Sequence, residues 1–125
     1  MILGLGIDLC GLDRIAAAIE RPRFLERVYT PAERARIEAA AGARRVEIAA
    51  GLYAAKEAAA KALGTGFSGF GPWDIEILPD AGGAPRCALM NGAAVRAEAL
   101  AAEYRLFVSV THDAGTAAAV AVLEG

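Results

Sequence analysis

Hydrophobic and polar positions in the N-terminal half of the chain predict one strand followed by several helices. The strand is expected over residues 2–9, and the helices over residues 12–20, 30–42 and 44–63. The strand is almost continuously apolar, which predicts burial on both of its faces. Pro22 disfavours continuation of the first helix. Thr30, Pro31 and Glu33 form a capping-box pattern at the start of the second, and Gly64 is placed to end the third.

The C-terminal half predicts four strands and one more helix. The strands are expected over residues 73–78, 85–90, 105–111 and 116–123, and the helix over residues 91–103. Apolar Trp73, Ile75 and Ile77 alternate with acidic residues, which is typical of a half-buried strand. Residues 112–115 are expected to join the last two strands as a hairpin, and Asn91 can cap the helix. This order of elements indicates a mixed α+β domain.

Length and composition narrow the class of protein. With 125 residues and 12.9 kDa, the chain has room for a single domain, residues 1–125. Hydrophobic residues make up 56 %, which excludes disordered and collagen-like chains. Charges or glycines interrupt each apolar stretch before the roughly 18 residues that a membrane span needs. Residues 1–4 show no signal-peptide pattern, and Cys10 and Cys87 are too few for a disulfide scaffold. A reduced, cytoplasmic protein is therefore expected.

Two features of the composition point to partners. The 31 alanines bury little area each, so we expect neighbouring subunits to supply part of the core. Although the net charge is −2, residues 21–45 contain seven arginines and three glutamates, a local balance of +4. Such a basic segment favours an acidic or phosphorylated partner, with a solvated helical face as the alternative. Nucleic acid is disfavoured because the isoelectric point is near 5.4 and aromatic residues make up only 6 %.

Asp8 interrupts the apolar strand predicted at the N-terminus. An unpaired carboxylate there would cost several kcal/mol of desolvation free energy. Asp8 must therefore lie at the end of the strand, where backbone N–H groups satisfy it, or pair with a cation, or bind a metal.

Glu57 and Lys61 lie four residues apart on the long helix and so share one of its faces. An ordinary intrahelical ion pair is the simplest interpretation. The residues around them are nearly all alanine, however, so a large ligand could approach closely. Asp8 and Glu57 as oxygen donors, with Lys61 nearby, would suit Mg²⁺ holding a diphosphate.

A glycine-rich segment and a single histidine complete the candidate chemistry. Gly64 and Gly66 follow the long helix and could let backbone N–H groups approach an anion, or could form a flexible connection. His112 is the only histidine, and it could be a turn residue bonded to the backbone. No nucleophilic elbow surrounds any serine, which disfavours a hydrolase triad. One histidine and two distant cysteines do not make a zinc site.

Three blocks of sequence occur together, in order, in one known family. They are Gly4–Asp8 with Asp13–Ile15, Tyr53–Ala58 with Lys61–Gly66, and Val108–His112 with Ala117–Val120. On these blocks the chain resembles the bacterial holo-[acyl-carrier-protein] synthases, which are short-type 4′-phosphopantetheinyl transferases. The resemblance covers essentially the whole chain.

The resemblance implies transfer of the 4′-phosphopantetheine moiety of coenzyme A to a serine of apo acyl carrier protein. The products would be holo acyl carrier protein and adenosine 3′,5′-bisphosphate, in support of fatty acid biosynthesis. The implied fold is the 4′-phosphopantetheinyl transferase fold, a small mixed sheet packed with helices. It would be assembled as a homotrimer with active sites between subunits. Asp8 and Glu57 match the family's Mg²⁺ ligands, Lys61 its diphosphate-binding lysine and His112 the histidine of its C-terminal motif; these four are the expected catalytic residues.

The same resemblance assigns two larger sets of residues. Those expected to bind coenzyme A are Lys61, Gly64, Gly66, Arg44, Arg45, Pro85 and His112. Those expected to dock the acidic helix of the carrier protein are Arg14, Arg21, Arg23, Phe24, Arg27 and Tyr53, with the arginines away from the metal site. Two residues depart from the family pattern: Leu52 stands where many relatives have arginine, and Ala84 replaces a frequent lysine or arginine. Arg44 and Arg45 are then the candidates for the 3′-phosphate.

Two other functions stay open. One is a non-catalytic module that binds coenzyme A or a carrier protein, against which the intact Asp8, Glu57 and Lys61 argue. The other is a structural oligomerisation domain or the C-terminal domain of a large fatty-acid synthase, and Met1 directly before the first strand favours a free-standing protein instead. For the transferase itself, the base that deprotonates the acceptor serine could be Glu57 or a metal-bound water.

Overall fold

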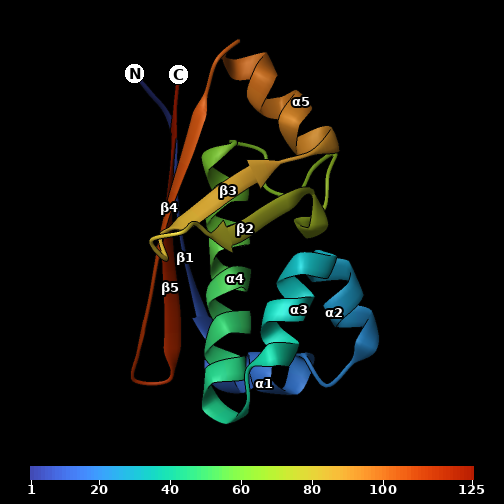
Figure 1. The fold of residues 1–125 in the computed structure, drawn as a ribbon. Coiled ribbons are helices and arrows are strands. Elements are labelled where there is room, and N and C mark those ends of the chain that lie inside the picture. The colour runs from blue at the N-terminus through green and yellow to red at the C-terminus, as the bar shows by residue number, and fades with distance from the viewer.

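A computed structural model describes residues 1–125, and its elements surround one long central helix (Figure 1). In chain order they are β1 (Ile2–Gly11), α1 (Leu12–Ala18), α2 (Pro22–Val28), α3 (Pro31–Ala39), α4 (Gly42–Ala62), the 3₁₀ turn η1 (Pro72–Asp74), β2 (Ile75–Pro79), β3 (Pro85–Leu89), α5 (Asn91–Leu100), β4 (Arg105–Asp113) and β5 (Thr116–Glu124).

The first and last strands of the chain are neighbours in one antiparallel sheet. Its order is β1–β5–β4, and β2 and β3 form a separate two-stranded antiparallel sheet. At the open end of the sheet the terminal amine of Met1 donates to the carbonyl oxygen of Gly125 at 2.6 Å. Figure 1 shows the three long strands along one side of α4, with α1, α2 and α3 on its other side. This is a mixed α/β fold, as the α+β prediction required.

Helix α4 is the core of the molecule, and its small residues explain how closely the sheet approaches it. Alanines dominate its buried positions, and β5 contributes further buried alanines at 117, 119 and 121. Much of the alanine content therefore serves contacts within the chain, where a helix and a sheet pack with their backbones close together. None of the helices combines the length and the apolar character that crossing a membrane would demand.

The two faces of the three-stranded sheet differ sharply. On the inner face, Gly6, Asp8 and Cys10 of β1 lie toward α4, and Cys10 is only 2 % exposed. On the outer face, Leu5, Ile7 and Leu9 are 65–67 % exposed. The predicted N-terminal strand is confirmed, but its predicted burial on both faces is wrong for the single chain. The reason is that α4 covers only one face of the sheet.

Two local expectations around η1 are corrected. Trp73 and Asp74 belong to the 3₁₀ turn, so the strand begins at Ile75, and Trp73 is 49 % exposed rather than buried. The buried Asp74 carboxylate holds this turn by accepting hydrogen bonds from the backbone N–H of Gly71 and from Nδ2 of Asn91. Asn91 therefore does not cap α5; it is the first residue of that helix, with φ of 50°, and the helix ends at Leu100 rather than near residue 103.

The other helix and turn signals give a mixed result. The Thr30–Glu33 capping box forms as predicted, with both reciprocal hydrogen bonds present. The last two strands form the predicted hairpin, but its turn consists of Ala114 and Gly115 alone, so His112 lies on β4. Helix α2 was not predicted: Pro22 begins it as the first helical residue, a position where its missing N–H costs nothing.

Candidate active site

The backbones of α4 and β1 touch, because glycines on the strand face alanines on the helix. A Cβ atom built on Gly4 or Gly6 would lie 1.8 Å from the carbonyl oxygen of Ala62 or Ala58, respectively. No residue larger than glycine fits at either position without moving the helix. This contact fixes the distance between the strand that carries Asp8 and the helix that carries Glu57 and Lys61.

Lys61 reaches from α4 to β1. Its Nζ donates to the carbonyl oxygen of Ile7 at 2.9 Å and lies 3.3 Å from Oδ1 of Asp8. Asp8 lies in the middle of β1, so the strand-end interpretation is wrong and the cation-paired one is confirmed. Glu57 forms no ion pair with Lys61, so the ordinary intrahelical pair is also absent. We call Asp8, Glu57 and Lys61 the metal edge.

Charged groups at the metal edge shift the pKa values of neighbouring side chains. Burial raises the pKa of the Cys10 thiol, with the Arg14 guanidinium acting against this and the carboxylates of Asp8 and Glu57 adding to it. Burial likewise raises the pKa of Tyr53, and Glu57 adds to that shift. The carboxylates of Asp8 and Glu57 thus both disfavour ionisation of the Cys10 thiol.

The donors at the metal edge fit a magnesium ion better than a metal that needs a full protein cage. No cluster of three or more His, Cys, Asp or Glu side chains occurs in the chain. Magnesium ordinarily takes one or two carboxylates and completes its octahedron with waters and phosphate oxygens. Asp8 and Glu57 provide that number of hard oxygen donors, and Lys61 provides a cation for a phosphate beside them.

A buried ion pair that sequence reasoning missed anchors α4 next to the metal edge. Lys56 and Glu33 are 1 % and 0 % exposed, and Nζ lies 2.7 Å from Oε1. Lys56 also donates to the carbonyl oxygens of Pro72 and Ile75, and Oε2 of Glu33 accepts from the backbone N–H of Ile77 at 2.8 Å. Burial lowers the pKa of Lys56, an effect that the Glu33 carboxylate opposes.

This pair ties together α3, α4 and the start of β2. Because Lys56 directly precedes Glu57, the anchor restricts rotation of α4 about its axis at the residue that carries a candidate metal ligand. A sequence signal was available for Lys56, a charged residue among the alanines of α4, but not for Glu33, whose place in the capping box accounted for it and whose helix is mainly exposed. What the sequence lacked was any indication that they meet.

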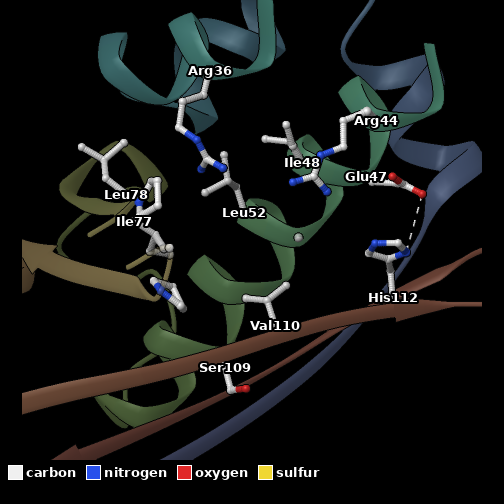
Figure 2. Close-up of a pocket in the computed structure, with 14 residues that line it drawn as sticks. Arg36, Arg44, Glu47, Ile48, Leu52, Ile77, Leu78, Ser109, Val110 and His112 are labelled. Carbon is white, nitrogen blue, oxygen red and sulfur yellow. Dashed lines mark ion pairs between the residues drawn. The ribbon is translucent and has the colours of Figure 1, made fainter. Parts of the chain in front are cut away.

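A second group of charged side chains lines a cavity of about 350 Å³ between α3, α4, the β2–β3 hairpin and β4. We call it the arginine cavity; Arg36, Arg44, Glu47, Leu52 and His112 lie on its wall. Figure 2 shows the guanidinium groups of Arg36 and Arg44 pointing into it from α3 and α4. Nδ1 of His112 lies 3.6 Å from Oε2 of Glu47, so a carboxylate is its neighbour, and the alternative of a turn histidine bonded to the backbone is wrong.

The cavity includes some of the residues expected to bind coenzyme A and leaves out others. Pro85 lines it together with Arg44 and His112, whereas Arg45 does not, and Nε of Arg45 is buried without a hydrogen-bond partner. Arg36 and Glu47 were not among the expected residues.

The metal edge and the arginine cavity lie on opposite flanks of α4. Glu57 follows Ile48 on the cavity wall by nine residues, or two and a half turns, which places the two on opposite sides of the helix. In the sheet, β5 separates β1 from β4, so Cys10 and His112 lie two strands apart. Gly64 and Gly66 follow Lys61 at the C-terminal end of α4, whereas the cavity residues of α4 lie in its N-terminal half. One chain thus holds the expected coenzyme A residues in two separate groups.

The expected docking residues gather around a hollow beside α1 and α2. Arg14, Arg21 and Phe24 line this hollow, and the ring of Phe24 stacks on Tyr53 with centroids 5.9 Å apart. The guanidinium group of Arg14 donates to the Tyr53 hydroxyl at 3.3 Å. Arg14 therefore lies beside the metal edge, which corrects for this one arginine the expectation that the docking arginines lie away from it. Arg23 and Arg27 are exposed on α2.

Comparison with known proteins decides the family. The family model of the 4′-phosphopantetheinyl transferase superfamily matches residues 4–121, nearly the whole chain. The chain belongs to this superfamily. Its curated relatives place it among the holo-[acyl-carrier-protein] synthases, and the resemblance inferred from the sequence motifs is thereby confirmed.

Relatives in the holo-[acyl-carrier-protein] synthase family match over their full lengths. The protein of Solidesulfovibrio magneticus is 55 % identical over 128 residues, covering 100 % of both chains. The protein of Nitratidesulfovibrio vulgaris strain DP4 is 50 % identical over 127 residues, covering 99 % of each.

Solved structures of family members agree with the fold. The Bacillus anthracis enzyme, in complex with coenzyme A (3′,5′-ADP), is 35 % identical with a TM-score of 0.85, covering 100 % of this chain and 98 % of that one. The Neisseria meningitidis enzyme is 31 % identical with a TM-score of 0.86, covering 100 % of both chains.

Proposed function

We propose that this protein transfers 4′-phosphopantetheine from coenzyme A to a serine of apo acyl carrier protein, in the cytoplasm and in support of fatty acid biosynthesis. Membership of the holo-[acyl-carrier-protein] synthase family supports the reaction class. The observation that carries the proposal is the metal edge, where Lys61 and Asp8 meet beside Glu57 in a neighbourhood lined by small residues.

In this reaction the serine hydroxyl oxygen attacks the phosphorus atom that bears the pantetheine arm. The bond from that phosphorus to the bridging diphosphate oxygen breaks, and adenosine 3′,5′-bisphosphate leaves with the electron pair. The serine proton passes to a base, either Glu57 or a water. Such a transfer depends on positioning and on neutralising phosphate charge more than on covalent chemistry, so a protein nucleophile is not required.

Asp8 and Glu57 are the residues that would hold Mg²⁺, with Lys61 binding a phosphate oxygen as a point charge. Bound there, the ion would neutralise charge that develops on the diphosphate. The contact between Gly6 and Ala58 holds the backbones that carry the two carboxylates close together before substrate binds. Histidine at position 112 lies on the other flank of α4, and we propose that it acts on the coenzyme A bound by a neighbouring subunit.

We propose a homotrimer in which each active site combines the metal edge of one subunit with the arginine cavity of the next. Two observations support it. The outer sheet face exposes Leu5, Ile7 and Leu9 on β1, and across β5, in register with Leu5, Phe107 on β4 is 45 % exposed; these are apolar side chains of the kind that protein interfaces cover. The metal edge and the arginine cavity also face away from each other within one chain. One coenzyme A molecule can therefore contact both only if two subunits contribute to its site.

Assembly has two direct tests. Light scattering should give a mass of about three times the 12.9 kDa chain. Mixing equal amounts of Glu57→Ala and His112→Ala subunits should restore about a quarter of the wild-type activity. In random assembly, about one site in four combines an intact metal edge from one subunit with an intact arginine cavity from the next. Each variant alone should be inactive. A fully active monomer, or a mixture as inactive as its components, would contradict the shared site.

The reaction itself is tested by mass spectrometry of apo carrier protein incubated with coenzyme A, Mg²⁺ and this protein. We expect a gain of one phosphopantetheine and release of adenosine 3′,5′-bisphosphate. The matched controls are EDTA and the Asp8→Ala variant, both of which should prevent the gain. Tight binding of coenzyme A without any gain in mass would favour the non-catalytic binding module instead.

A further inference from the structure

The arginine cavity contains two cations that the chain leaves without partners. Neither Arg36 nor Arg44 forms an ion pair, and neither guanidinium group donates a side-chain hydrogen bond within the chain. The single carboxylate on the wall, Glu47, lies beside His112. Two guanidinium groups directed into one concave space form a site for an anion, because each presents several N–H donors in a planar arrangement.

The position of Arg36 follows from how α3 is held. The helix begins at the Thr30 capping box, and its Ile37 is fully buried against the core, so rotation of the helix is restricted. Glu33, one turn before Arg36, could have paired with it but is engaged by Lys56. The guanidinium group of Arg36 is therefore free to extend over Leu52, toward the space into which Arg44 points (Figure 2).

Because position 52 holds an apolar leucine, the positive charge that Arg36 brings to the cavity is needed there. Leu52 is 4 % exposed and forms an apolar part of the cavity wall on α4. Helix α4 therefore supplies positive charge to the cavity only through Arg44, and the second guanidinium group comes from a different helix. The anion that fits is compact and multiply charged, since it must accept donors from two arginines across the cavity.

We propose that Arg36, together with Arg44, binds the 3′-phosphate of coenzyme A and makes the enzyme prefer coenzyme A over 3′-dephospho-coenzyme A. This inference rests on the proposed function. Coenzyme A carries two separate anionic groups, the diphosphate and the 3′-phosphate. The diphosphate suits the metal edge, where Lys61 and the carboxylates lie. The arginine cavity offers cations with no carboxylate pair for a metal, and so it suits the phosphate monoester.

The test compares two substrates that differ by this one phosphate. Arg36→Gln should raise KM for coenzyme A roughly tenfold, since a charge-assisted contact is lost, and leave kcat nearly unchanged. Its KM for 3′-dephospho-coenzyme A should change less than about twofold, because that substrate lacks the group concerned. Arg36→Lys keeps the charge and should retain most of the preference.

The matched control is Arg34→Gln, on the same helix and with the same change in charge. Arg34 donates to the carbonyl oxygen of Tyr29 and does not line the cavity, so its removal should leave the ratio of the two KM values unchanged. If Arg36→Gln also left that ratio unchanged in an active enzyme, Arg36 would be only a structural arginine near the end of α3. If Arg34→Gln reduced the ratio equally, general electrostatic attraction would account for the effect, and the assignment would be overturned.

A binding measurement separates this inference from the proposed reaction. In calorimetry, the wild type should bind adenosine 3′,5′-bisphosphate more tightly than adenosine 5′-monophosphate, and Arg36→Gln should lose most of that difference. If the wild type transferred no phosphopantetheine and Arg36→Gln still lost the difference in affinity between the two nucleotides, the phosphate site would be supported and the transferase rejected. No difference between the two nucleotides in the wild type would reject the site, whatever the enzyme's activity.

Discussion

The metal edge and the arginine cavity both lie against α4, yet they are built in different ways. At the metal edge, backbones touch: a Cβ on Gly6 would lie 1.8 Å from the Ala58 carbonyl oxygen. At the arginine cavity, long side chains from α3 and α4 point into an open space of about 350 Å³. The first arrangement fixes how closely the backbone of β1, which carries Asp8, approaches the backbone of α4, which carries Glu57. The second leaves Arg36 and Arg44 free to adjust.

The difference matches what each region would have to do. Transfer of a phosphoryl-type group requires reacting atoms to be aligned, and small displacements cost large factors in rate. Recognition of a terminal phosphate tolerates movement, since a guanidinium group can follow the anion and still donate two hydrogen bonds. Changes at the metal edge should therefore lower kcat, whereas changes at the two cavity arginines, Arg36 and Arg44, should raise KM for coenzyme A.

The largest effect is expected from the carboxylates. Asp8→Ala or Glu57→Ala should lower kcat/KM by at least about a hundredfold, because each removes a candidate ligand at the position where charge develops. Steady-state assays in metal-buffered solution measure this, and circular dichroism checks the fold. The control is Glu38→Ala, which removes an exposed carboxylate on α3 and should leave kcat/KM unchanged. Rates like those of the wild type for either metal-edge variant would remove the contrast between the two regions.

Next in size is the effect of filling the helix–strand contact. Gly6→Ala should lower the free energy of unfolding by about 3 kcal/mol, because the added methyl group forces β1 away from α4. Gly11→Ala is a matched control on the same strand: nothing lies within 4 Å of the added Cβ, and no change is expected. Denaturant unfolding of both variants gives the comparison. Equal stability of the two would show that the contact is not rigid.

The docking surface should respond more weakly and more selectively. Arg23→Glu should raise KM for carrier protein roughly tenfold and leave KM for coenzyme A unchanged, since exposed charges chiefly steer encounter. Arg14→Glu should change both constants, because Arg14 donates to Tyr53 beside Glu57. Increasing NaCl should weaken carrier-protein binding by screening. Arg86→Glu, on β3, serves as the control, and an equal effect there would remove the assignment to α1 and α2.

The smallest expected effect is a loss of stability at high pH, and it arises from buried groups outside both the metal edge and the arginine cavity. Burial raises the pKa of Cys87 to about 12 from a usual 9.0, and it raises the pKa of Tyr29 as well. Both groups stay protonated in the folded state while the unfolded chain ionises, so their contribution is fully present below pH 9 and is lost as pH rises toward 12. Thermal unfolding should show a falling midpoint over this range, and Cys87→Ala should make the fall shallower. An unchanged slope in that variant would contradict the burial of the thiol.

Local signals in the sequence were enough to predict much of the fold. The capping box at Thr30, the helix ending before Gly64 and the C-terminal hairpin all depend on residues within a few positions of one another. The motif blocks also sufficed to identify the family. Local signals misled where a distant partner intervened: Asp74 holds η1 through Asn91, which removes Trp73 from the strand and Asn91 from its capping role.

The residue types of the candidate site were determined by the sequence, but their grouping was decided by the tertiary structure. That Asp8 and Glu57 are oxygen donors and that Lys61 shares a helix face with Glu57 follows from the order of residues alone. That Lys61 turns to Asp8 instead, that Lys56 is buried on Glu33, and that Arg36 joins Arg44 across Leu52 depends on contacts between elements far apart in the chain. The physical reason is that helix periodicity fixes directions within one element, whereas which elements face each other is set by the packing of all of them together.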